Sequence, residues 1–207
     1  MVEISFPPPD SGSPIFKILN PGTKLKRIFD PTKYNTQATS FRHYGPISRF
    51  DHHRSFLDKP NFDLERGINY WGLSLCCCLV EVFGDTRVIE TKNKEVALVI
   101  LTKPIKLLDL RGSGAMKAGT VSAISQTAQR NLSQAWSRYF YENHEIYSEI
   151  DGLLFNNAHN NEKAIALYER AKPQLDSAKI FSLPLDHPDL YTAIADCAIN
   201  NNLIFDN

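Results

Sequence analysis

The chain has 207 residues, of which 43% are hydrophobic, and its 23 lysines and arginines balance its 23 aspartates and glutamates. This length and apolar fraction suffice for one domain with its own core, and two independent domains are not expected. Because the formal net charge is zero, no overall field would draw the protein to nucleic acid or to an anionic membrane. We therefore expect a small-molecule or protein partner, no direct nucleic-acid binding and no membrane binding.

The sequence offers no signal for a membrane or for secretion. No apolar run approaches the roughly 20 residues that cross a bilayer. The first residues, MVEISFPPPDSGSP, lack the basic start and apolar core of a signal peptide. We therefore expect a cytoplasmic protein.

Cysteine and histidine spacing gives no sign of a metal site. Cys76, Cys77 and Cys78 are contiguous and Cys197 stands alone, which suits neither a disulfide framework nor a zinc site. The adjacent pair at residues 52–53 would point to opposite faces of a strand and could not easily hold one ion. We expect reduced core cysteines and no metal.

The N-terminal part is rich in proline. Five prolines fall within residues 1–22, which predicts an extended arm rather than an early strand, with the folded domain covering 23–207. A short strand is expected at residues 25–30. Residues 34–67 form a long polar connection of the kind that often carries function.

One carboxylate interrupts the apolar run INYWGLSLCCCLVEVFGD at residues 68–85. Ser74 as an N-cap and Gly84 just past the end predict a helix that contains Glu81. Such a helix would be apolar on every side and therefore buried. An ionised carboxylate there must be paired or solvated through a cleft, because unpaired burial costs several kcal/mol.

We expect a partner for this carboxylate elsewhere in the chain. Arg27 in the first strand and Arg49 in GPISRFDHH are candidates. A guanidinium suits the role because it makes bidentate contacts and stays charged.

The remainder mixes strands and helices without regular alternation. We expect strands at 86–91, 96–102, 105–110, 152–155 and 163–169, and helices at 120–144 and 187–200. This order predicts an α+β single domain with a mixed central sheet and flanking helices.

Five segments resemble the RES domain family in order and approximate spacing. They are LKRIFD, GPISRFDHH, RGINYWGLSLCCCLVEVFGDTRVIE, LLDLRG and IDGLLFNNAHNNEKAIALYERA, and together they span about Lys24 to Ala171. The family is similar to the diphtheria-toxin-like ADP-ribosyltransferases, which implies a fold built around an NAD+ cleft. Its characterised members degrade NAD+ as phosphorylases or glycohydrolases. They commonly serve as toxins held in check by a helix-turn-helix antitoxin.

The resemblance implies site residues by position. The catalytic residues would be Glu81, Arg49 and Tyr70, and the NAD+-binding residues Arg27, Arg49, Tyr70 and Asn157. Glu81 would stabilise positive charge on the ribose as nicotinamide leaves. The arginines would hold the diphosphate, and the Tyr70 ring would stack against nicotinamide or ribose. Asn157 stands where the family has a serine and would replace the hydrogen bond of that serine.

Several alternatives stay open at this point. Inorganic phosphate, water or a protein side chain could accept the ADP-ribose, and the last of these would make the chain an ADP-ribosyltransferase. Because Asn157 replaces the family serine, a catalytically silent NAD+-binding module is a further reading. A helix-turn-helix antitoxin is the implied protein partner, and a homodimer is also compatible with the sequence.

Overall fold

An eight-stranded sheet forms the body of the computed structural model, which describes residues 3–7 and 12–206. Its order is β1-β7-β8-β9-β5-β2-β6-β10, and all neighbours are antiparallel except β7 and β8. The strands are β1 (Phe16–Leu19), β2 (Lys24–Phe29), β5 (Ile68–Gly72), β6 (Glu95–Ile100), β7 (Ile105–Asp109), β8 (Gly152–Asn156), β9 (Lys163–Tyr168) and β10 (Lys179–Pro184). A separate hairpin pairs β3 (Tyr44–Gly45) with β4 (Asn61–Phe62).

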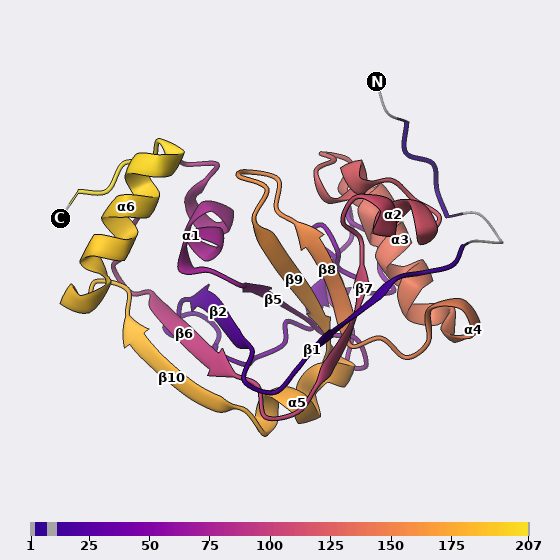
Figure 1. The fold of residues 1–207 in the computed structure, drawn as a ribbon, viewed down its shortest axis with the longest axis horizontal. Coiled ribbons are helices and arrows are strands. Elements are labelled where there is room, and N and C mark those ends of the chain that lie inside the picture. The colour runs from indigo at the N-terminus through magenta and orange to yellow at the C-terminus, as the bar shows by residue number, and fades with distance from the viewer. Residues whose placement is uncertain (1–2, 8–11, 207) are drawn as a thin grey trace.

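Helices accompany this curled sheet, and most of them gather at its two ends. They are α1 (Leu75–Phe83), α2 (Ser113–Lys117), α3 (Arg130–Glu142), α4 (His144–Tyr147), α5 (Lys172–Asp176) and α6 (Tyr191–Asn201). Figure 1 shows α6 beside α1 at the end that holds β2, β6 and β10, and α2, α3 and α4 at the other end. The predicted α+β single domain with a mixed sheet is thus confirmed.

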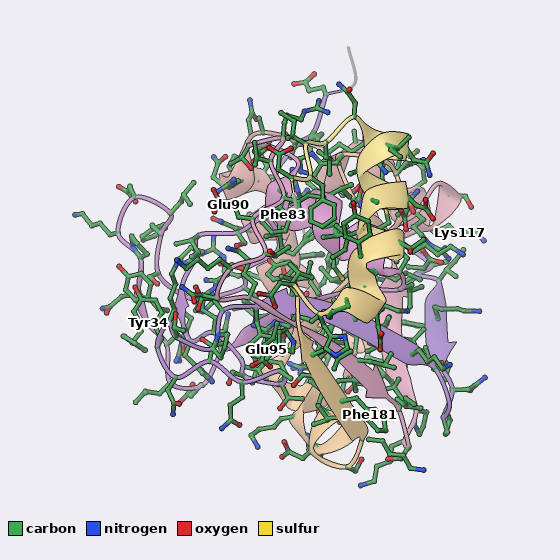
Figure 2. All side chains as sticks on the ribbon, turned by 90° about the vertical axis from the view of Figure 1, so that its left-hand side faces the viewer. Tyr34, Phe83, Glu90, Glu95, Lys117 and Phe181 are labelled. Atoms are coloured by element: carbon green, nitrogen blue, oxygen red, sulfur yellow. A yellow bond between two sulfur atoms is a disulfide. The ribbon has the colours of Figure 1, made fainter. Side chains whose placement is uncertain are left out.

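Apolar residues pack into three clusters around this sheet. One joins α3 to β7 and β8 around Trp136 and Phe140. A second lies around Trp71 and Ile165 of the central strands. The third packs α1 against α6, where Phe83 lies beside the α6 ribbon (Figure 2). These clusters fix α1, the helix that contains Glu81, against both β5 and the C-terminal helix.

Two expectations about the strands are wrong, and one strand was not expected. Residues 16–19 form β1, although we expected an arm without a strand, while the division of the chain at residue 22 stays a prediction. Part of that arm, residues 1–2 and 8–11, lies outside the described residues. Residues 86–91 were expected to form a strand, but Val88 makes only an isolated bridge, because Arg87 has φ of 62° and breaks the extended run. The edge strand β10 was missed.

The cysteines also differ from expectation. Cys76 and Cys197 form a disulfide that joins α1 to α6, so the prediction that all four are reduced is wrong for this pair. Cys77 and Cys78 are free and buried, as expected. The pairing arises from the contact between two helices, and spacing along the chain cannot reveal such a contact.

None of the helices within the described ranges is long and apolar enough to span a bilayer.

Candidate functional site

A cavity of about 810 Å³ opens where β2 and β5 separate. The two strands share a single antiparallel pair, Lys26 with Gly72, whereas β2 pairs with β6 along its whole length. Beyond that pair the gap between the strands is lined by both of them, by one side of α1 and by the loop at residues 34–47. The volume lies within the range of roughly 300–1,000 Å³ that is usual for ligand pockets.

Local sequence signals place Glu81 on the cavity side of α1. The Ser74 hydroxyl caps the helix by accepting from the Cys77 N–H at 2.8 Å, and Gly84 ends it. Glu81 and Val82 line the cavity and are exposed, while Cys77 and Cys78, which also line it, are buried. The expectation of a helix buried all round is therefore wrong, and Glu81 is solvated through a cleft.

The carboxylate of Glu81 lies close to the backbone N–H of Ala158, which favours its ionised form. Partial removal from water raises the pKa of Glu81, and the nearby His159 and Arg49 act in the opposite direction. Burial is the largest of these effects, so the pKa of Glu81 stays above its ordinary value.

The two arginines flank the site without pairing directly to Glu81. No ion pair between Glu81 and an arginine occurs among the described residues. Arg27 lines the cavity and donates to the carbonyls of Ala38 and Ser40 at 2.8 and 3.0 Å. Burial lowers the pKa of Arg27 to about 10, with a contribution from Arg42.

Arg49 is not among the residues that line the cavity, and it lies in the turn that also contains Phe50. Its guanidinium donates to the Thr127 carbonyl. Burial lowers the pKa of Arg49, and Glu81 counteracts that shift, so the two charges interact through space.

Tyr70 belongs to a hydrogen-bonded network that sequence reasoning missed. Its hydroxyl donates to Asp51 at 2.9 Å and accepts from the Phe50 N–H at 3.0 Å. Asp51 is fully buried and also pairs with Arg42 at 2.8 Å. Asp51 follows Arg49 by two residues in GPISRFDHH, so the acid within that motif was the signal that could have indicated this network.

Asn157 lies in a tight turn outside the cavity lining. Its side chain is 1% exposed, and its Oδ1 accepts from the backbone N–H groups of His159, Asn160 and Asn161 at 2.9–3.1 Å. Its Nδ2 donates to Asn160 at 2.9 Å and to Cys77 Sγ at 3.4 Å. The amide thus shapes the turn that contains Ala158, and its predicted contact with ribose stays a prediction.

The adjacent His52 and His53 form hydrogen bonds with other groups of the protein. His52 Nε2 lies 2.9 Å from the Glu169 carboxylate and His53 Nε2 lies 3.2 Å from the Arg42 carbonyl. Within the described part of the chain, no three histidine, cysteine or carboxylate side chains cluster as metal ligands would. His159 is exposed and lies 4.0 Å from Asp85.

Comparisons with known proteins agree with this architecture. The fold is similar to that of a chain in the M. tuberculosis MbcT–MbcA toxin–antitoxin complex, with a TM-score of 0.56, 16% identity, and coverage of 86% of this chain and 92% of that one. The probable toxin y4kH of Sinorhizobium fredii (strain NBRC 101917 / NGR234) is 28% identical over 89 residues, which is 43% of this chain and 68% of the relative. Residues 24–191 match the RES domain. The chain therefore belongs to the RES domain family.

Proposed function

We propose that this protein is an NAD+-degrading toxin that breaks the bond between nicotinamide and ribose. The observation that carries the proposal is the Glu81 carboxylate, open to a cavity that Tyr70 and Arg27 also line. Membership of the RES domain family and similarity to a probable toxin support it.

The chemistry of the bond explains why a carboxylate is needed. As nicotinamide leaves, positive charge develops on the ribose through an oxocarbenium-like transition state. Glu81 faces that charge from α1 and stabilises it more strongly than it stabilises neutral ribose. The nearby Ala158 N–H favours the ionised form of this carboxylate.

The arginines and the tyrosine have binding roles. Arg27 and Arg49 present guanidinium donors of the kind that bind diphosphate oxygens in pairs. The Tyr70 hydroxyl is already engaged by Asp51 and Phe50, so its ring face is the part that contacts nicotinamide or ribose.

We infer that a protein antitoxin covers the cavity mouth. Four lining residues there are apolar or aromatic and exposed: Tyr34, Tyr44, Ile47 and Phe62, with exposed fractions of 98, 42, 38 and 67%. Figure 2 shows Tyr34 on a loop that projects from the body. Such an apolar rim suits a protein partner, and the structural relative is described in a complex with an antitoxin. With no basic excess, the chain alone should not bind DNA.

The test is incubation of the purified protein with NAD+, with and without inorganic phosphate, while nicotinamide release is followed. Release that depends on phosphate identifies a phosphorylase, and release without it identifies a glycohydrolase. Label transferred to a protein would instead identify an ADP-ribosyltransferase. The second candidate is a silent NAD+-binding module, which Asn157 at the serine position favours; it would bind NAD+ and release no nicotinamide.

A further inference from the structure

Two side chains of β5 carry buried polar atoms that no protein group satisfies. Asn69 is 1% exposed, and neither its Nδ2 nor its Oδ1 has a partner among the described residues. Trp71 is 3% exposed, and its Nε1–H also lacks a partner there. Both residues line the cavity. Buried polar groups are nearly always hydrogen-bonded, and leaving them unpaired costs folding free energy, so their partners must come from water or a ligand in the cavity.

Strand geometry puts the two groups together and separates them from Tyr70. Residues two apart on a strand share a face, so Asn69 and Trp71 project from one side of β5 and Tyr70 from the other. Trp71 packs in the same cluster as Leu25 of β2. Arg27 follows Leu25 by two residues and shares its face. The unpaired amide therefore lies on the Arg27 side of the gap between β2 and β5.

Nothing in the adjacent strand can satisfy the amide. Asn69 stands opposite Leu167 in β9, and Leu167 has no polar side chain. Its neighbours Ile68 and Trp71 in the same strand are buried apolar residues. An asparagine held there without a partner is the pattern expected of a binding residue, in which stability is given up for recognition.

We propose that Asn69 recognises the carboxamide of nicotinamide and makes the site selective for the amide over the acid form of the ring. This inference rests on the proposed function. The Asn69 Oδ1 accepts from the carboxamide NH2 while its Nδ2 donates to the carboxamide oxygen. A nicotinic acid ring has a carboxylate instead, which has no proton for Oδ1 and brings negative charge against it. The Trp71 Nε1–H is a further donor for the carboxamide oxygen.

The adenine edge also offers an adjacent donor and acceptor that match an asparagine. We assign nicotinamide because Asn69 lines the same cavity as Glu81, and under the proposed function the nicotinamide bond is cleaved beside Glu81. The two sources can be separated, because changing adenine to hypoxanthine alters the purine edge only and changing the carboxamide to a carboxylate alters the pyridine only.

The experiment measures binding of three dinucleotides to wild type and Asn69→Leu by calorimetry in phosphate-free buffer. The ligands are NAD+, nicotinic acid adenine dinucleotide and nicotinamide hypoxanthine dinucleotide. Wild type should prefer NAD+ over the nicotinic acid form by at least about tenfold, because a site built for a hydrogen bond rejects an analogue that lacks it. Asn69→Leu should bring the ratio of the two affinities, for NAD+ and for the nicotinic acid form, close to one. The ratio of the affinities for NAD+ and for nicotinamide hypoxanthine dinucleotide should stay unchanged. Asn156→Leu, the same change in β8 outside the cavity lining, should leave both ratios unchanged.

A second readout does not depend on ligand. Unliganded Asn69→Leu should melt at the same temperature as wild type or higher, because the substitution removes two unpaired buried polar atoms. Asn69→Thr, which also lacks the amide and suits a strand, repeats the binding test if the leucine variant does not fold.

The outcomes distinguish this inference from the proposed function. If wild type releases nicotinamide but Asn69→Leu keeps the full preference for NAD+, the inference fails and the proposed function stands. A collapse of the hypoxanthine ratio instead would mean that Asn69 binds adenine, which also overturns the inference. If wild type binds none of the three dinucleotides, both fail.

Discussion

The Tyr70 hydroxyl donates to the buried Asp51 carboxylate at 2.9 Å, and this bond ties the floor of the cavity to the loop that carries Arg49. Asp51 also accepts from the backbone N–H groups of Ile47 and Ser48 at 2.7 and 2.9 Å. One carboxylate therefore fixes both the ring of Tyr70 and the turn at residues 47–51. Tyr70 and the turn that carries Arg49 are thus positioned by Asp51, which does not itself line the cavity.

Replacing Tyr70 by phenylalanine should destabilise the fold. The change leaves the Phe50 N–H without its acceptor and removes one donor from Asp51, so the free energy of unfolding should fall by about 1–3 kcal/mol. Urea unfolding of wild type and Tyr70→Phe measures it. Tyr34→Phe is the matched control, because Tyr34 is 98% exposed and its loss should change stability by less than about 0.5 kcal/mol. Equal effects of the two variants would rule out the structural role of the Tyr70 hydroxyl.

Buried histidines should make stability fall in mild acid. Burial lowers the pKa of His53 to about 4, and the nearby Asp51 carboxylate offsets this lowering only in part. The unfolded chain binds this proton near pH 6.5 and the folded chain does not until about pH 4, so stability is lost as the pH falls through that window. His52, whose pKa burial also lowers despite its hydrogen bond to Glu169, acts in the same direction.

The histidine prediction is checked by the free energy of unfolding measured from pH 7 to pH 4. His53→Gln should show a shallower decline than wild type, with a remainder from His52. His144→Gln changes an exposed histidine of α4 and should keep the wild-type slope. Parallel curves for wild type and His53→Gln would contradict the assignment.

Local signals in the sequence were sufficient to predict α1. The Ser74 cap and Gly84 predicted α1 correctly, and Arg27, Tyr70 and Glu81 line one cavity as their motif positions implied. The prediction of α1 succeeds because a helix cap depends on residues within one helical turn. Whether those three residues also carry the chemistry stays a prediction.

The sequence was insufficient where distant segments decide the outcome. The polar partners of Tyr70 and the turn around Asn157 depend on how loops fold onto the sheet. The unpaired amide of Asn69 is visible only after the opposite residue in β9 is known. Spacing along the chain cannot supply contacts of this kind.

The disulfide between Cys76 and Cys197 should stabilise the protein under oxidising conditions. It closes a loop across a separation of 121 residues, so Cys197→Ser should lower the free energy of unfolding by about 2–5 kcal/mol without reductant. In excess reductant the variant and wild type should unfold alike, which is the control. A variant as stable as oxidised wild type would mean that the bond does not form in solution.

Glu81→Gln should separate a catalytic carboxylate from a structural one. Removing one member of a buried ion pair costs roughly 3–5 kcal/mol, but Glu81 is exposed to the cavity and the described residues include no ion pair with it. We therefore expect the melting temperature to change little. Nicotinamide release from NAD+ should fall by roughly two or more powers of ten, because the amide cannot stabilise the charge that develops on ribose.

The matched control for this last change is Glu162→Gln, which alters a carboxylate that accepts from Ser74 and Asn160 outside the cavity lining. It should keep nicotinamide release near the wild-type rate while changing stability. Calorimetry with NAD+ should show that Glu81→Gln still binds, since the arginines and the Tyr70 ring are unchanged. If Glu81→Gln releases nicotinamide at the wild-type rate, Glu81 is not the charge-stabilising group and the proposed mechanism fails.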